Sequence, residues 1–186
     1  MEIGKTFYAA DRKAWRDWLK HRYKTEREIW LIYYRKQTGK PRISYNDAVE
    51  EALCFGWIDS TVKNIDAERI AQKFSPRKTK SAYSQANKER LRRLVARGKV
   101  AKDIRAGLND ILTETFEIPP DILARLKAND RAWRNFQRYS GSYQRIRVGF
   151  VEAARRRPAE FAKRLKHLIR MTEKDKQFGY GIEAYF

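Results

Sequence analysis

The segment EALCFGWIDS, residues 51–60, joins an amphipathic helix to a strand and so decides how the first half of the chain folds. Ser44 predicts the N-cap of that helix, with Asp47 three residues later as an approximate capping box. Gly56 predicts its end, because glycine takes the left-handed conformation that closes helices at little cost. The residues after Gly56 predict a strand.

The elements on either side of this segment complete a mixed pattern. Periodicity and capping residues predict a helix at 12–23 after Asp11, a strand at 28–34, a hairpin of strands at 57–65 and 68–74, and a helix from Ser84 to Gly98. This order predicts an α+β fold: a small, mostly antiparallel sheet with helices on one side, followed by an all-helical C-terminal extension.

The weak pattern in the middle of the chain sets the expected boundaries. We expect an α+β unit at 1–100, a connector at 101–118, and a helical extension at 119–186 that packs on the first unit. The last dozen residues include four aromatic side chains, which are too apolar for an idle tail. We therefore expect this segment to dock onto the body of the protein or onto a second subunit.

Charge is the most unusual bulk property of the 186 residues. Lys and Arg number 42 against 23 Asp and Glu, giving a formal net charge of +19, while 42% of the residues are hydrophobic. The hydrophobic content is ample for a core. The excess of cations predicts an anionic partner such as nucleic acid, another polyanion or a small phosphorylated ligand. The alternative is a surface whose charge serves only solubility.

The cellular compartment is inferred from what the sequence lacks. Cys54 is the only cysteine, so no internal disulfide can form. The first residues lack the apolar core of a signal peptide, and no stretch approaches the ~18 apolar residues of a membrane span. We expect a cytoplasmic protein without a membrane span.

Basic residues concentrate in two predicted helical regions, from Ser84 to Arg105 and from Arg131 to Arg170. Between Arg131 and Arg170 there are twelve Lys and Arg residues against two acidic ones, with Trp133, Phe136, Tyr139 and Tyr143 interleaved. Such a surface can follow a phosphate backbone and stack bases on its aromatics. The alternative is a solvated helix face with the aromatics packed inside. The candidate surface residues are Arg90, Arg93, Arg97, Arg145, Arg155, Arg156, Arg157 and Lys163.

A second candidate is an anion-binding corner near the end of the predicted hairpin. A helix N-terminus offers free N–H groups to a phosphate or carboxylate, and basic residues precede it. The alternative is that the polar residues cap the helix while an Asp59–Arg77 pair ties the hairpin. The corner comprises Asp59, Arg77, Lys78, Ser81, Ser84 and Asn87.

No motif assigns a catalytic reaction, a metal or a cofactor. Cys54 lies in an apolar helix face, and the two histidines, His21 and His167, are far from it in sequence, so we expect a buried and inert thiol. One cysteine and two isolated histidines provide no metal-ligand spacing. There is no glycine-rich phosphate loop and no nucleophile elbow.

Three motifs resemble the bacteriocin-protection, YdeI/OmpD-associated family. They are the Ala-Leu-Cys-Phe-Gly-Trp-Ile-Asp core at 52–59, the Ser-Pro-Arg-Lys turn at 75–78, and the Ser-x-x-Ser-x-x-Asn run of Ser81, Ser84 and Asn87. The resemblance is strongest over residues 5–100 and weaker in the helical region, where Arg155-Arg156-Arg157-Pro158 replaces the usual pattern. It implies a fold and an association with stress resistance, and it carries no established enzyme mechanism.

Three functional classes follow from these observations. The favoured one is a binding protein for an anionic partner, with nucleic acid as the expected partner. The second is a stress or antimicrobial-peptide resistance factor that acts through protein contacts, although a cationic protein attracts cationic peptides poorly. The third is an enzyme that acts on a small anionic substrate at the Asp59/Arg77 corner.

Overall fold

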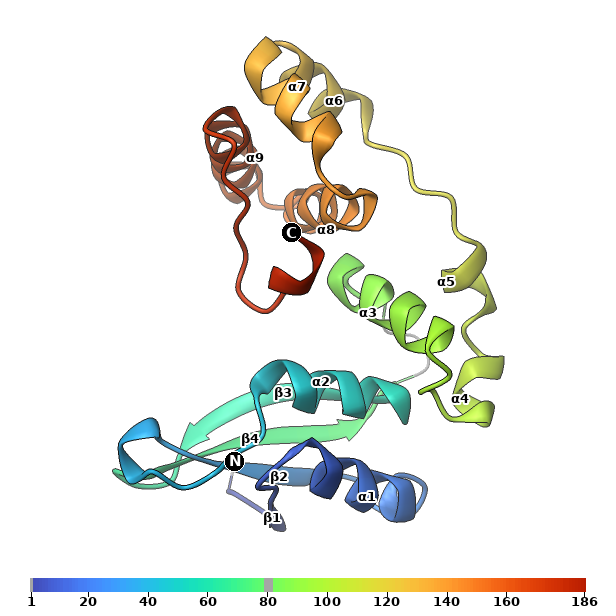
Figure 1. The fold of residues 1–186 in the computed structure, drawn as a ribbon, viewed down its shortest axis with the longest axis vertical. Coiled ribbons are helices and arrows are strands. Elements are labelled where there is room, and N and C mark those ends of the chain that lie inside the picture. The colour runs from blue at the N-terminus through green and yellow to red at the C-terminus, as the bar shows by residue number, and fades with distance from the viewer. Residues whose placement is uncertain (1, 79–81) are drawn as a thin grey trace. The chain divides into compact units, whose positions relative to one another are not determined.

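The computed structural model describes residues 2–78 and 82–186 (Figure 1). The chain divides into two units, which are described separately. The first comprises residues 1–81 and 91–110, and the second comprises 82–90 and 111–186. Helix α3 (Gln85–Ala96) is therefore shared, because its first half counts with the second unit and its second half with the first. The predicted boundaries at 100 and 119 remain predictions.

The first unit is built on a four-stranded mixed sheet in the order β1-β2-β4-β3. Strand β2 pairs antiparallel with β4, which pairs antiparallel with β3, and the short β1 pairs parallel with β2. The predicted α+β fold with a mostly antiparallel sheet is thus confirmed. Strand β1 was not predicted, because three residues are too few for a periodic signal. The strands are β1 (Thr6–Tyr8), β2 (Ile29–Tyr34), β3 (Trp57–Asn64) and β4 (Arg69–Pro76).

Helices α1 (Arg12–Arg22) and α2 (Tyr45–Cys54) pack on one face of this sheet. The predicted caps are confirmed: Asp11 accepts a hydrogen bond from the backbone N–H of Ala14, and Ser44 accepts one from that of Asp47. The Trp15 ring of α1 lies 5.3 Å from the Phe74 ring of β4, centroid to centroid. Two Trp side chains, Trp15 and Trp57, are almost completely buried and anchor this face.

Gly56 ends α2 as predicted, with a φ of +71°. A Cβ atom at this position would lie 2.8 Å from the Cδ1 atom of Ile104, so both the conformation and the packing require glycine. Ile104 belongs to α4 (Lys102–Ala106), the short helix that follows α3. The segment 51–60 therefore turns from helix to strand against a third element, α4, for which the sequence gave only a weak helical pattern.

The opposite face of the sheet has its own small cluster of buried side chains. Trp30 and Ile32 of β2 pack with Ala71 of β4, and Ile3 and Ile65 cover them. Strand β2 is consequently buried on both faces, as its near-continuous apolar run predicted.

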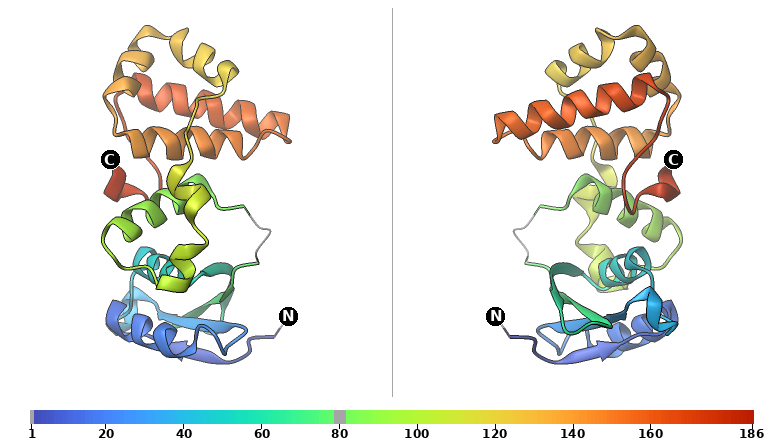
Figure 2. Two further views of the ribbon diagram at one scale, coloured as in Figure 1. Left: turned by 90° about the vertical axis from the view of Figure 1, so that its right-hand side faces the viewer. Right: turned by 90° about the vertical axis from the view of Figure 1, so that its left-hand side faces the viewer.

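The second unit is helical beyond Pro120, as predicted, and no strand follows that residue within the described part of the chain. Helices α8 and α9 lie side by side in both views of Figure 2 and pack with α6 and α7 around one core. That core contains Phe136, Val148 and Leu168. The helices are α5 (Asn109–Thr113), α6 (Pro120–Lys127), α7 (Asp130–Arg138), α8 (Gly141–Glu152) and α9 (Pro158–Glu173).

The aromatic C-terminal segment docks onto this helical unit. Tyr143 of α8 holds it twice, since its hydroxyl accepts a hydrogen bond from the backbone N–H of Phe178 at 2.9 Å and its ring meets that of Phe186 edge to face. Ser140 donates to the carbonyl oxygen of Tyr185 at 2.6 Å. Two short 3-10 turns, Lys36–Thr38 and Glu183–Tyr185, complete the described structure.

None of the helices in residues 2–78 and 82–186 has the length and apolar character needed to cross a membrane.

Candidate functional site

The predicted anion-binding corner is distributed over both units. In the first unit, Asp59 faces the helical side of the sheet and accepts hydrogen bonds from the Tyr45 hydroxyl at 3.1 Å and the Gln72 amide at 2.8 Å. Arg77 follows β4, and its backbone N–H donates to the Gly56 carbonyl oxygen at 2.8 Å. Lys78 is exposed. The partners of Asp59 are therefore neutral donors that fix its place on β3.

In the second unit, Ser84 and Asn87 lie at the start of α3. The Ser84 hydroxyl accepts a hydrogen bond from the backbone N–H of Asn87 at 3.3 Å, which is a helix cap. The Asn87 side chain accepts one from Arg90 at 2.9 Å. Ser81 lies outside the described residues. The corner as an anion site stays a prediction.

Several residues of the predicted basic surface are not available to a partner. Arg90 is buried, with 7% of its surface exposed, and donates to the Gly181 carbonyl oxygen at 2.5 Å. Including it in a surface was wrong, because its side chain anchors the C-terminal segment. Arg145 forms a two-bond pair with the buried Glu89, both bonds 2.8 Å long. Arg155 pairs with Asp121 and Glu152.

Two residues of the predicted basic surface, Arg93 and Arg97, belong to the first unit, and their surroundings differ. Arg93 contacts the buried carboxylate of Glu50 and is neutralised by it. Arg97, by contrast, is exposed near the end of α3.

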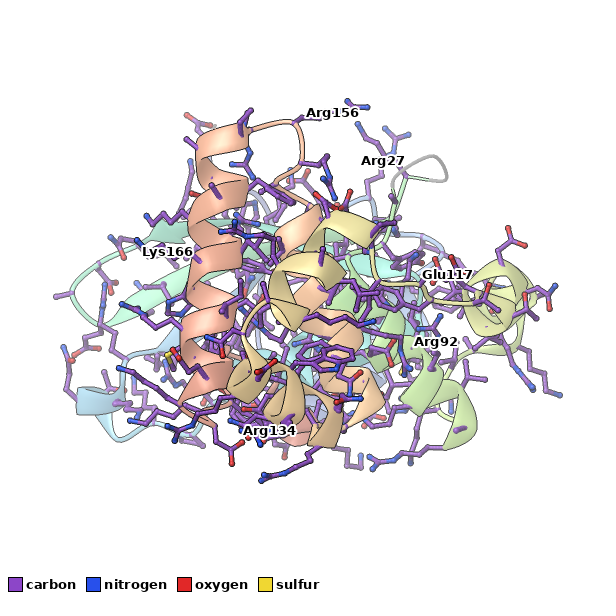
Figure 3. All side chains as sticks on the ribbon, turned by 90° about the horizontal axis from the view of Figure 1, so that it is seen from above. Arg27, Arg92, Glu117, Arg134, Arg156 and Lys166 are labelled. Carbon is purple, nitrogen blue, oxygen red and sulfur yellow. The ribbon has the colours of Figure 1, made fainter. Side chains whose placement is uncertain are left out.

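The second unit also has exposed cations at and along α9, which we call the basic face. Lys163, Lys166 and Arg170 recur every three or four residues and so share one side of the helix. Figure 3 shows Arg156 beside the start of α9 and Lys166 projecting from its flank. Within residues 2–78 and 82–186, no ion pair joins these side chains to an acid. The basic face consists of Arg156, Arg157, Lys163, Lys166 and Arg170.

The interleaved aromatics do not form a stacking platform. Phe136 is 1% exposed and Tyr143 is fully buried, so neither can stack on a base. Trp133 and Tyr139 pack against the helical core. The stacking part of the prediction was wrong because the same spacing that places aromatics between cations also places them on the inner face of each helix.

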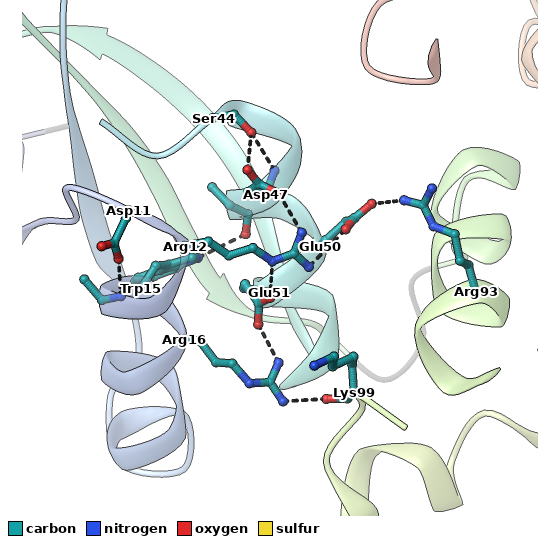
Figure 4. Close-up of polar contacts among 12 residues, drawn as sticks. Asp11, Arg12, Trp15, Arg16, Ser44, Asp47, Glu50, Glu51, Arg93 and Lys99 are labelled. Carbon is teal, nitrogen blue, oxygen red and sulfur yellow. Dashed lines mark hydrogen bonds and ion pairs between the residues drawn. The ribbon is translucent and has the colours of Figure 1, made fainter. Parts of the chain in front are cut away.

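A buried ion-pair network joins three helices of the first unit (Figure 4). Glu51 of α2, with a side chain only 3% exposed, accepts hydrogen bonds from Arg12 at 2.5 Å and Arg16 at 2.6 Å. Glu50 pairs with Arg12 at 3.1 Å and with Arg93 of α3. Burial alone lowers the pKa of Arg12, but the carboxylates of Glu51, Glu50 and Asp47 together outweigh this and raise the pKa above its usual value. Every charge here has a partner, which is typical of a structural network.

Cys54 lies one helical turn after Glu50 and is fully buried, as predicted. Burial, reinforced by the charge of Glu51, raises the pKa of its thiol to about 11. The thiol is therefore protonated at neutral pH and lacks the thiolate that nucleophilic chemistry needs.

A cavity lined by described residues lies wholly within the second unit. Its volume is about 720 Å³, and it opens among α8, α9, the start of α3 and the C-terminal segment. Gly179, at a φ of +133°, lets this segment turn against the wall, where a Cβ atom would collide with Ile182 at 2.6 Å. The apolar wall is formed by Ala86, Ile146, Phe150, Ala153, Phe178 and Ile182.

Arg147 of α8 is the buried charge of this cavity. It is 6% exposed, and its guanidinium carbon lies 3.8 Å from the centroid of the Phe178 ring and 4.9 Å from that of Phe150. Its Nε atom is buried and makes no hydrogen bond within the described residues. Burial lowers the pKa of Arg147, and the nearby Arg164 lowers it further.

Two protein-family models match parts of the chain. Residues 7–107 match the model of a domain of unknown function, DUF8412, and residues 115–175 match the model described as "Bacteriocin-protection, YdeI or OmpD-Associated". The chain belongs to the DUF8412 family, whose model covers more than half of it, and residues 115–175 are similar to the second family. No curated protein and no solved structure matches it.

The matched residues differ from those at which the sequence motifs placed the resemblance to the YdeI/OmpD-associated family. The resemblance to the YdeI/OmpD-associated family is confirmed for residues 115–175, in the helical region, whereas the sequence motifs placed it most strongly at 5–100. Those motifs, at 52–59 and 75–87, fall instead within the DUF8412 match. The cavity residues of α8 and α9 thus lie in the YdeI/OmpD-associated region, and the buried network lies in the DUF8412 region.

Sequence reasoning missed Arg147 as a site residue. It was counted among twelve cations of one basic region, and nothing in residue type separates a buried arginine from an exposed one. One signal was available: Arg147 stands between the apolar residues Ile146 and Val148.

Proposed function

We propose that the protein binds a polyanion through the basic face, and that nucleic acid is this partner. The observation that carries the proposal is the presence of five exposed cations at and along α9 that form no ion pair with an acidic side chain within the described residues. From Arg157 to Arg170 the chain advances ~20 Å at 1.5 Å per helical residue, long enough to meet several phosphates of one strand. Recognition is electrostatic and independent of base sequence.

The neutralised cations sharpen this proposal. Arg145 and Arg155 lie in the same region of the sequence, yet their charges are already satisfied by Glu89, Asp121 and Glu152. They contribute little to the attraction of a polyanion. The basic face, and not the total net charge, therefore determines affinity.

Fluorescence anisotropy with labelled duplex and single-stranded DNA, at several salt concentrations between about 50 and 200 mM, tests the proposal. We expect log K to fall with log salt by ~0.9 for each phosphate neutralised on duplex DNA. The variant R156Q/R157Q/K166Q should bind more weakly and with a shallower salt slope.

A matched control removes the same charge elsewhere. Lys20, Arg22 and Lys36 are exposed in the first unit, and none pairs with an acid within the described residues, so K20Q/R22Q/K36Q also loses three charges. It should retain most of the affinity. Equal losses in the two variants would mean that net charge alone attracts the DNA. Wild-type binding no tighter than about 1 mM at low salt, well outside the usual non-specific range, would remove nucleic acid as the partner.

A further inference from the structure

The cavity of the second unit contains a positive charge that no described residue neutralises. Arg147 makes two ring contacts, with Phe178 and Phe150, but no hydrogen bond or ion pair within residues 2–78 and 82–186. A guanidinium has five N–H donors, and each donor left without an acceptor in a buried site costs free energy. The ring contacts recover part of this cost but provide no acceptor.

The other charges around the cavity do not supply an anion to Arg147. Arg164 donates to Glu160 at 2.7 Å, so the one acidic side chain of the lining is already paired. Lys163 adds a second cation. His167 contacts the Phe178 ring edge to face at 4.6 Å, and burial together with Arg170 and Arg147 lowers its pKa. The cavity is therefore positive, with its deepest charge on Arg147.

The walls of the cavity are largely apolar. Ile146, Phe150, Phe178 and Ile182 surround the space beside the guanidinium. Phe150 is 44% exposed and Tyr180 is 84% exposed, so part of the cavity lining is open to solvent. Small-molecule sites combine such apolar walls with a few convergent polar groups, and their volumes range over about 300–1,000 Å³. The volume of about 720 Å³ lies within this range.

We propose that this cavity binds a small organic acid, whose carboxylate pairs with Arg147 and whose apolar body lies against Phe150, Phe178 and Ile182. The planar guanidinium matches a carboxylate through two parallel N–H bonds, and the apolar walls select a ligand with a hydrocarbon or aromatic body. The inference goes beyond the proposed polyanion surface, because a single buried arginine between two rings has no room for a nucleic-acid backbone. A body of roughly ten carbon atoms suits a site of this size.

The experiment uses the full chain and four probes in isothermal titration calorimetry. Decanoate carries both the charge and the apolar body, decanamide carries the body without the charge, and acetate carries the charge without the body. Inorganic phosphate represents a bare anion. We expect decanoate to bind, decanamide to bind at least tenfold more weakly, and acetate and phosphate to show no saturable binding.

Two variants locate the site, and a third separates it from the basic face. Arg147→Met keeps the length and apolar stem of the side chain but removes its charge, and it should weaken decanoate binding at least tenfold. Ala153→Trp fills space from an exposed wall position, so it should block binding without disturbing the core. The variant R156Q/R157Q/K166Q alters no residue of the cavity lining and should bind decanoate as the wild type does.

The outcomes are distinct. Equal affinity for decanoate and decanamide, or unchanged decanoate binding in Arg147→Met, would show that Arg147 does not bind the carboxylate of the ligand. Phosphate binding as tight as decanoate binding would contradict the role of the apolar walls. Loss of decanoate binding in the R156Q/R157Q/K166Q variant would place the ligand on the basic face and overturn the proposal. Failure of DNA binding with intact decanoate binding would reject only the polyanion function.

Discussion

Arg12 and Arg16 of the first unit and Arg147 of the second are helical arginines that pack against buried groups, but their surroundings differ. Arg12 and Arg16 converge on Glu51, whose side chain is 3% exposed, so the buried carboxylate and both half-buried guanidinium groups have an opposite charge within hydrogen-bond distance. Arg147 is more deeply buried and meets two aromatic rings in place of a carboxylate.

This difference separates a structural charge from a candidate binding charge. A paired buried charge holds elements together, since removing either partner leaves the other unsatisfied. An unpaired buried charge beside a cavity destabilises the empty protein and can recover that free energy when an anion enters. The comparison predicts opposite responses to mutation in the two units.

The largest expected effect is at Glu51. Glu51→Gln removes the charge that Arg12 and Arg16 share, and the free energy of unfolding should fall by about 2 kcal/mol, below the 3–5 kcal/mol of fully buried pairs because both guanidinium groups are about a third exposed. Urea denaturation measures this. The control Glu68→Gln changes an exposed acid of the β-hairpin and should stay within about 0.5 kcal/mol of wild type. A Glu51 effect as small as the control would mean that the network is only a solvated cluster.

Substitution of Arg147 should not lower the free energy of unfolding, in contrast to substitution of Glu51. Arg147→Met removes a buried charge without a partner, and this gain should outweigh the lost contacts with Phe178 and Phe150, worth about 0.5–2 kcal/mol, so the free energy of unfolding should equal or exceed that of the wild type. The same urea titration gives the answer. A loss as large as that of Glu51→Gln would erase the distinction between the two units.

The smallest expected effect concerns pH. Burial, with Arg170 and Arg147, lowers the pKa of His167 below its usual 6.5 in the folded chain. As the pH falls below 6.5, the unfolded chain therefore binds a proton first, and stability declines until the lower folded-state pKa is passed. Thermal unfolding between about pH 7.5 and pH 5 should show this decline, and His167→Gln should reduce it. An identical pH profile in the variant would indicate that His167 titrates normally.

Much of the fold was predictable because its signals are local. Asp11 and Ser44 cap helices, and Gly56 closes one, through bonds and dihedral angles that involve only a few neighbouring residues. The apolar run of β2 predicted burial on both faces, which the structure confirms. Strand β1 escaped prediction, and the region of helix α4 gave only a weak helical pattern, because a short segment adopts its conformation only when a partner strand or a packed side chain such as Ile104 stabilises it.

The candidate sites were less accessible to sequence reasoning. The family and the excess of positive charge could be recognised, but not which cations remain available. Glu89 lies 56 residues from Arg145, and Asp121 lies 34 residues from Arg155, so their neutralisation depends on helix packing. Base stacking by Phe136 and Tyr143 was a reasonable hypothesis until their burial was known.

The sequence by itself determined the α+β order, the helix caps, the burial of Cys54 and the strongly basic character of the chain, because composition and short-range periodicity encode these properties. Tertiary structure alone decided that Arg90 is an internal anchor, that Arg12 and Arg16 are neutralised, and that Arg147 lines a cavity without a counter-charge. The physical reason is that the energy of a charge depends on its solvent exposure and on partners within a few ångströms, and distant parts of the chain supply both.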